Sequence, residues 1–185
     1  MYIAVVVVAF IMIAIVLMYN SLIVKRNQVD NVFSTIDVML KKRYDLVPNL
    51  VETVKGYMTH ERQLLEEVTQ LRAQAMEQRG RPDAQVEIDN IFGSLLGQLL
   101  AVVENYPDLK ASGNFMHLQR TLTNLEEQIS AARRAYNAAV TDFNTAIQVF
   151  PTNILAGTMN FRKRKLFVIR EEEKKVIDAG EVLKT

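Results

Sequence analysis

The chain has 185 residues, with 22 basic and 21 acidic side chains, a formal net charge of +1 and no cysteine. A sequence without cysteine excludes disulfide frameworks, thiolate nucleophiles and cysteine-ligated metal centres. The balanced charge argues against a nucleic-acid-binding protein, and seven glycines and four prolines are few for the turns of an all-β domain. We therefore expect an all-α protein built from long helices.

The first predicted element is an apolar helix over residues 1–24. Only Asn20 and Ser21 in this stretch fall outside the hydrophobic set, and no side chain is charged. At about 1.5 Å per residue the helix would reach roughly 36 Å, enough for a hydrocarbon core of roughly 30 Å. The alternative is a cleaved signal peptide, but the stretch lacks a basic n-region and a small-x-small cleavage site. The sequence therefore predicts an uncleaved single-pass anchor, with membrane lipids as its partner.

Two basic residues, Lys25 and Arg26, follow the apolar run, and no basic side chain precedes it. Basic residues favour the cytoplasmic side of a span. We therefore expect the N-terminus outside and the domain over residues 25–185 in the cytoplasm.

The second predicted element is a helix over about residues 25–79, in which apolar residues recur at close to 3.5-residue spacing from Val29 to Ala75. Such a long stripe is typical of a coiled-coil-like bundle helix. Pro48 lies inside it and removes one backbone donor. Because the apolar spacing keeps its phase across the proline, we expect a kink rather than two helices, and a helix that continues directly out of the membrane.

Two more helices are predicted over about residues 84–105 and 115–150. The segment Arg79-Gly80-Arg81-Pro82-Asp83 combines helix-stop and helix-start signals, and Tyr106 to Asn114 is the clearest irregular connection. The helix over 84–105 has a wide apolar arc, which predicts burial on more than one side or a contact with another subunit. We expect the three main helices to form an antiparallel bundle, with a less regular, partly helical segment over residues 152–185.

Catalytic and metal motifs are missing from the sequence. His60 and His117 have neither the Glu-x-x-His spacing of di-iron bundles nor the His-Glu-x-x-His spacing of zinc proteases. Phosphate-binding loops and nucleophile elbows are also absent. We expect no catalytic residue, no cofactor, no metal and no nucleic-acid partner.

Several polar residues lie at or beside the apolar stripes, where an unpartnered group would be costly. We expect Asp37 and Asp45 to form local ion pairs with the basic residues at 41–43. The other polar residues at the stripes are Asn49, Asn124, Asn137 and Asn144. Buried polar residues at these positions would fix the register in which the helices of a long bundle pack. The alternative is that they line a polar binding groove.

A basic run close to the C-terminus is a candidate lipid-headgroup contact, worth about 1 kcal/mol per close basic residue. It consists of Arg162, Lys163, Arg164 and Lys165. The alternative is a solvated face, since the acidic residues 171–173 reduce the local field.

Motifs in order along nearly the whole chain resemble the LemA family of bacterial membrane-anchored proteins. They are Tyr19 to Leu22, Ile36 to Val51, Val54 to Tyr57 with His60-Glu61, Glu104 to Ala111, Ala132 to Asn137, and Phe150-Pro151 with Asn153. The resemblance implies an N-terminal anchor in the bacterial cytoplasmic membrane and a helical-bundle domain, without a catalytic mechanism. The motif positions give a candidate interaction or architectural surface: Lys42, Arg43, Tyr44, Asp45, Pro48, Asn49, Tyr106, Pro107, Asp108 and Lys110.

Two functions are consistent with these features. The first is a non-enzymatic scaffold that self-associates at the inner membrane and organises or shapes the envelope. The second is an adapter that binds and modulates another membrane protein, such as a protease or transporter. The wide apolar arc of the helix over 84–105, and its glycines at 93 and 97, favour the homo-oligomer.

Overall fold

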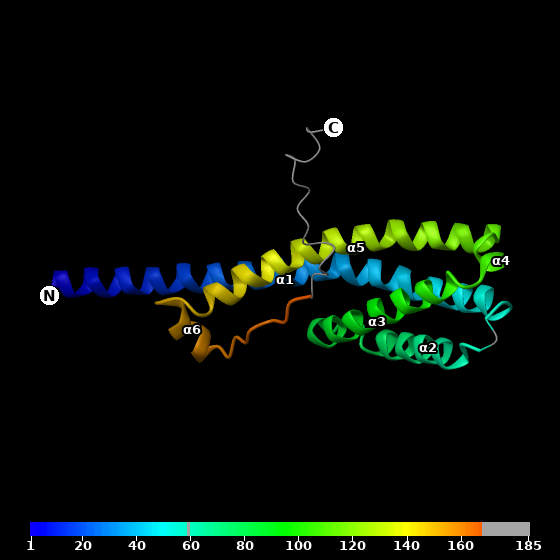
Figure 1. Cartoon of the computed structure of the whole chain (residues 1–185). Coiled ribbons are helices and arrows are strands. Elements are labelled where there is room, and N and C mark those ends of the chain that lie inside the picture. Colours follow the sequence, from blue (N-terminus) through cyan, green and yellow to red (C-terminus); the bar gives the residue numbers. More distant parts are fainter. Residues whose placement is uncertain (59, 168–185) are drawn as a thin grey trace, which may run out of the picture. The chain divides into compact units, whose positions relative to one another are not determined.

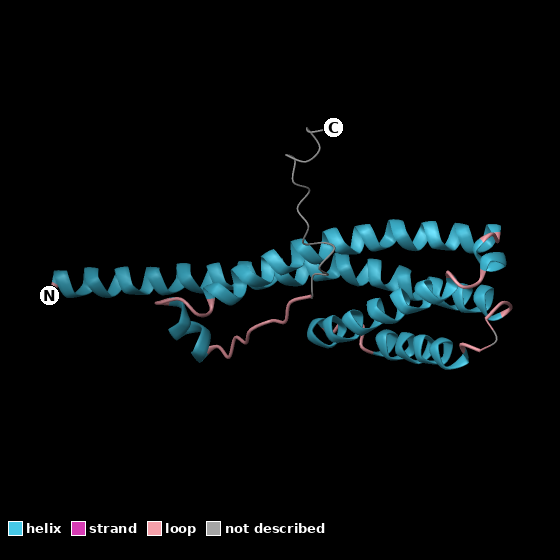
Figure 2. Ribbon diagram, viewed as in Figure 1, coloured by secondary structure: helices cyan, strands magenta, loops and turns pink. Residues whose placement is uncertain are grey.

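The computed structural model describes residues 1–58 and 60–167, and this part of the chain is all-α, as predicted (Figure 1, Figure 2). The helices are α1 (Tyr2–Lys55), α2 (Arg62–Glu77), α3 (Pro82–Val103), α4 (Pro107–Lys110), α5 (Gly113–Ala146) and α6 (Thr152–Thr158). Residues 168–185, the second half of the segment predicted over 152–185, lie outside the described residues.

Helix α1 runs for 54 residues and passes through Pro48 without ending. Its first half matches the predicted anchor: side chains from Met1 to Ile13 are exposed, and the 18-residue window at the N-terminal end is apolar enough to cross a membrane. From Leu22 onward a seam of apolar side chains is buried. One helix therefore supplies both the apolar run and a packing face, as the sequence predicted.

The predicted single helix over residues 25–79 is wrong, because the chain breaks between α1 and α2. Helix α1 ends at Lys55, immediately before Gly56, and Met58 donates its backbone N–H to the Val54 carbonyl at 2.9 Å. Glycine is unfavourable inside a helix and common just after one. Met58 is 2% exposed, so the turn is held by a buried apolar side chain. The stripe kept its phase across this break, which is why spacing alone suggested a continuous helix.

The predicted stop and restart near residue 80 is confirmed. Gly80 has a φ of +76°, a left-handed conformation that glycine adopts without steric cost. Pro82 then occupies the first turn of α3, where its missing N–H is not needed. Helices α2 and α3 pack against each other in consequence (Figure 1).

The chain forms two compact units. One comprises residues 1–35 and 135–166, here called the anchor unit, and the other comprises residues 36–134 with Phe167, here called the bundle unit. In the anchor unit the ring of Phe33 packs on Tyr136 at 6.0 Å, and Phe143 packs on Phe161 at 6.0 Å. Each unit therefore has apolar packing of its own.

Helix α3 is apolar and long enough to pass for a second membrane span, but it is a core helix of the bundle unit. Its buried positions recur every three or four residues, as expected for one face of a packed helix. They are Gln85, Val86, Asp89, Phe92, Gly93, Leu96, Leu99 and Val103. Two of these are polar, so the core of the bundle unit contains more than apolar packing.

Candidate functional site

A network of buried charges joins three helices of the bundle unit. Arg43 of α1 donates hydrogen bonds to Asp89 of α3 and, at 2.7 Å, to Glu126 of α5. Arg133 of α5 donates from Nη2 to the second oxygen of Asp89 at 2.5 Å. The side chains of Arg43 and Asp89 are completely buried, that of Arg133 is 3% exposed, and that of Glu126 is 28% exposed. We call these four residues the buried ion network.

The buried ion network is neutral as a whole, because two guanidinium groups face two carboxylates. Burial lowers the pKa of Arg43, but the charges of Asp89 and Glu126 raise it by more, so its pKa lies above the ordinary value. The Arg43 guanidinium also lies 4.9 Å from the ring centre of Phe92 and 5.5 Å from that of Tyr44. Arginine over an aromatic face is a favourable cation–π arrangement. Charge neutralisation and ring contact therefore offset the cost of burying Arg43.

Tyr44 borders the network and has a strongly perturbed hydroxyl. Its side chain is fully buried, and its ring meets Phe92 edge-on at 5.0 Å. Burial raises the pKa of Tyr44 to about 12, and the charge of Asp89 adds to the rise. The unfolded chain should have a tyrosine pKa near 10.

Tyr44 should therefore make the protein sensitive to alkali. A raised folded-state pKa gives stability that is complete below about pH 10 and is lost as pH rises towards about 12. Replacing Tyr44 with phenylalanine should make the free energy of unfolding fall less steeply over that range, by up to about 1.4 kcal/mol per pH unit. Urea titrations between pH 9 and 11 would measure this difference. Equal slopes for both proteins would contradict a buried Tyr44 hydroxyl.

A second polar cluster joins α1 to the turn after α2 and to α3. Asp37 accepts hydrogen bonds from Arg79 Nη2 at 2.6 Å and from Gln85 Nε2 at 3.0 Å. Hydrogen bonding to Asp37 is the main reason that the pKa of Arg79 is raised. The expected local pairing is found for Asp45, which pairs with Lys41 one turn away. Asp37 instead pairs with residues remote in sequence, so it fixes how helices meet rather than stabilising α1 alone.

The first half of the predicted candidate surface divides between core and solvent. Arg43 and Tyr44 are buried and belong to the ion network and its border. Pro48 and Asn49 are exposed. Lys42 and Asp45 line a groove of about 440 Å³ whose other lining residues are Leu46, Thr121, Asn124, Leu125 and Gln128. Asn124, one of the polar residues noted beside the apolar stripes, therefore lies at this groove.

The second half of the candidate surface lies where α3 ends and α4 begins. Tyr106 donates its hydroxyl hydrogen to Glu61 Oε1 at 2.7 Å, and this hydrogen bond raises the pKa of Tyr106. Pro107 and Asp108 form the first turn of α4, and Lys110 pairs with Glu104. Tyr106 therefore fastens the turn between α3 and α4 to the chain segment just before α2, and the Lys110–Glu104 pair lies within the turn itself.

The basic run at 162–165 is also divided. Arg162 and Lys163 are exposed. Arg164 is partly buried and lies 3.6 Å from Asp30, while its backbone N–H and carbonyl both bond to Asn144 at 2.9 Å. Arg164 therefore holds its segment to α1 and α5, while the side chain of Lys165, like those of Arg162 and Lys163, is exposed.

Sequence reasoning did not single out Asp89, Glu126 or Arg133. A signal for Asp89 was present, because it lies between Gln85 and Phe92 on the apolar face of α3 at helical spacing. Arg133 lies within the motif Ala132 to Asn137 that carries the family resemblance. Which basic residue meets which carboxylate depends on tertiary packing, so spacing could not supply the pairs.

The chemistry of the buried ion network is that of a helix clamp. Both oxygens of Asp89 are occupied by guanidinium groups, which leaves that carboxylate unsuited to proton transfer or metal binding. Among residues 1–58 and 60–167, no group of three histidine, aspartate or glutamate side chains is placed to hold a metal ion. The network is suited to holding α1, α3 and α5 in one register.

The fold and this clamp define a class: a membrane-associated helical-bundle protein with an N-terminal apolar helix. The LemA family model matches residues 32–179, and the chain belongs to the LemA family. It is 29% identical over 163 residues to Protein LemA of Metamycoplasma hominis, covering 88% of this chain and 74% of that protein. It is also 27% identical over 186 residues to Magnetosome protein MamQ 2 of Paramagnetospirillum magneticum, covering 87% and 68% respectively.

Proposed function

We propose that this LemA-family protein is a non-enzymatic, membrane-anchored scaffold that self-associates at the bacterial cytoplasmic membrane and helps to organise the envelope. One observation carries the proposal: α1 continues from Tyr2 to Lys55, and its N-terminal apolar window has no buried residue. The helix that offers an apolar face to lipid therefore also supplies a packing face of the domain. As a membrane anchor, α1 would keep the domain at the membrane surface.

The proposed topology follows from the charges beside the apolar run. Lys25 and Arg26 come directly after it, which favours a cytoplasmic domain and an external N-terminus. The exposed cations Arg162 and Lys163 are suited to anionic lipid headgroups on the same side.

Confinement to a membrane supports assembly through weak contacts, because it raises the effective concentration of each domain for its neighbours. Ile91 offers such a contact, since this side chain is 55% exposed on α3. An exposed isoleucine on this apolar helix would lose its water contact in a lateral dimer.

Crosslinking in native membranes tests this self-association. Because the chain has no cysteine, an Ile91→Cys variant carries a single thiol. Mild oxidation should convert that variant to a disulfide-linked dimer far more efficiently than a Gln70→Cys variant, whose thiol would lie at an exposed position on α2. Gels run without reductant would measure the dimer fraction.

The contradictory outcome is a monomer in both variants, together with a monodisperse monomer in mild detergent. Equal dimer yields from Ile91→Cys and Gln70→Cys would indicate random collision, and would also contradict a contact centred on Ile91.

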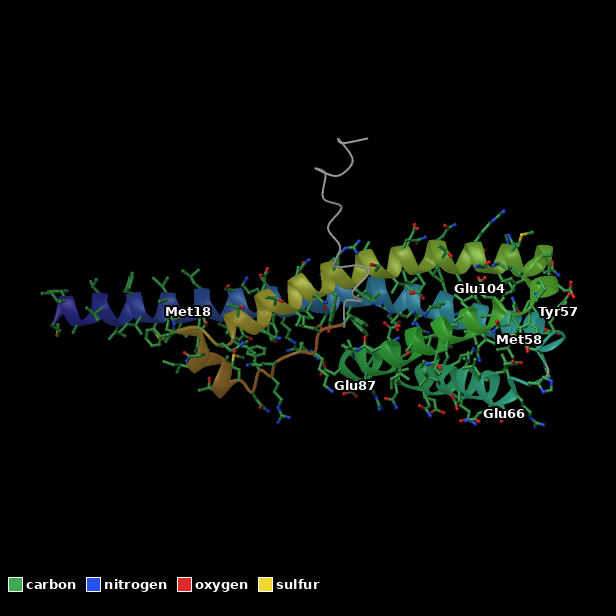
Figure 3. All side chains as sticks on the ribbon, viewed as in Figure 1. Met18, Tyr57, Met58, Glu66, Glu87 and Glu104 are labelled. Atoms are coloured by element: carbon green, nitrogen blue, oxygen red, sulfur yellow. The ribbon has the colours of Figure 1, made fainter. Side chains whose placement is uncertain are left out.

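A second candidate function is an adapter for another membrane protein, which the grooves of the bundle unit favour. A groove of about 650 Å³ lies between the end of α1 and α2. Met58 and Glu66, labelled in Figure 3, are among the residues that line it. An adapter would copurify with a different membrane protein, and alteration of the Tyr106 to Lys110 surface would abolish that copurification. A scaffold would be recovered with copies of itself.

A further inference from the structure

The anchor unit exposes a second apolar feature besides the anchor helix itself. Val149 and Phe150 lie in the turn between α5 and α6, and Ile154 lies on α6; their exposed fractions are 48%, 80% and 59%. Large apolar side chains that cluster at the surface mark an interaction site more often than chance packing. The chemistry of the surrounding residues identifies what covers them.

The position of these apolar side chains along the anchor helix follows from the pairing of α1 with α5. The two helices run in opposite directions in the anchor unit, and Phe33 of α1 contacts Tyr136 of α5 (Figure 1). Both helices rise about 1.5 Å per residue, so a position on α5 approaches the N-terminus of α1 as its number increases. Eleven residues beyond Tyr136, Ile147 reaches the level of Leu22.

Burial along α1 agrees with this depth. Side chains up to Ile13 are exposed, Met18 is partly covered, and Leu22 is completely buried. A lone helix cannot bury its own leucine, so other chain segments reach the last two turns of the apolar run. The apolar run of 24 residues exceeds a hydrocarbon core of roughly 30 Å by about 6 Å, which places the last of these turns, with Leu22, at the membrane interface.

Charge is ordered along the same axis. Arg164 lies 3.6 Å from Asp30, and Asp30 lies six residues beyond the end of the apolar run at Val24, or about 9 Å along the helix. The exposed side chains of Arg162 and Lys163 belong to this segment. Moving away from the N-terminus of α1, apolar side chains thus come first and cations follow. Lipid acyl chains and anionic headgroups have the same order.

We propose that Val149, Phe150 and Ile154 form an interfacial wedge that inserts into the lipid leaflet beside the end of the anchor. The partner is the bilayer itself, and Arg162 and Lys163 contact its anionic headgroups. The wedge rests on the proposed anchoring of α1 and adds a second point of membrane contact. Two contacts on one unit restrain the tilt and rotation of the anchor.

Depth-dependent fluorescence tests the wedge in the full-length chain. Single-thiol variants would be labelled with an environment-sensitive dye and reconstituted into vesicles of phosphatidylcholine and phosphatidylglycerol. Dye at Ile154→Cys should show blue-shifted emission, quenching by nitroxides placed high on the acyl chains, and loss of quenching by aqueous iodide. Ala138→Cys is the matched control. Ala138 is exposed on α5, two residues after Tyr136, whose partner Phe33 lies nine residues beyond the end of the apolar run. Dye at this position should therefore remain accessible to iodide.

Dye at Phe10→Cys reports the anchor separately, because Phe10 is 73% exposed near the middle of the apolar run. Deep nitroxides should quench it. If they do and iodide quenches Ile154→Cys as strongly as Ala138→Cys, the wedge is wrong while the anchor stands. If iodide reaches Phe10→Cys, the anchoring itself is wrong. Protection of Ile154→Cys from both iodide and lipid nitroxides would mean that a second copy covers the site, which also overturns the wedge.

Discussion

Replacing Asp89 with asparagine should lower the free energy of unfolding by about 3–5 kcal/mol, which is typical for removal of one partner from a buried ion pair. Asp89 is fully buried and bonds to both Arg43 and Arg133. Without its charge, two guanidinium groups remain in the core, and only Glu126 is left to oppose them. Urea denaturation of the full-length protein in mild detergent, followed by circular dichroism, would measure the loss.

Asp45→Asn is the matched control for this experiment. Asp45 also pairs with a basic residue, Lys41, but both side chains are more than 40% exposed. Exposed pairs of this kind contribute about 0–1 kcal/mol. If Asp89→Asn proved as mild as Asp45→Asn, the buried ion network would not be the clamp described here.

Replacing Phe92 with alanine should also cost about 3–5 kcal/mol, because truncation of a buried aromatic leaves a cavity. Phe92 is completely buried, and its ring meets Tyr44 edge-on at 5.0 Å. It also lies 4.9 Å from the Arg43 guanidinium. The substitution therefore removes apolar packing and the aromatic partner of a buried charge together.

Gln98 provides the control for Phe92. Gln98 is exposed on the same helix, so Gln98→Ala should change the free energy of unfolding by no more than about 0.5 kcal/mol. The same urea titration compares the two variants. Similar losses for both would mean that α3 presents a different face to the core from the one described.

Much of the fold could be predicted from local signals. Pro82 and Gly80 marked the restart of α3, and the apolar stripe marked α5, because burial of one helix face leaves a helical period in the sequence. The stripe predicts a helix to Phe150, whereas α5 ends at Ala146. The break after Lys55 was missed for the same reason. Its apolar period continues from α1 into α2, and a stripe reports which side chains are buried but not whether the backbone between them is helical.

The candidate site was predictable only in part. The segment over 42–49 drew attention to Arg43 and Tyr44, yet both are core residues rather than members of an exposed surface. Asp37 was expected to bind its neighbours on α1 and instead binds Arg79 and Gln85. Sequence spacing suggests ion pairs between residues one helical turn apart, whereas the folded bundle pairs charges that are more than forty residues apart in the sequence. Pairings of that kind follow from packing and are invisible to periodicity.

The central claim is self-association at the membrane, and the mass of the complex in native lipid tests it most directly. The full-length protein would be extracted with its surrounding lipid by an amphipathic copolymer, without detergent, and its mass determined particle by particle. The scaffold predicts a protein mass that is a multiple of 21.1 kDa, without a second protein. Particles that contain one copy, alone or with a different membrane protein, would contradict it.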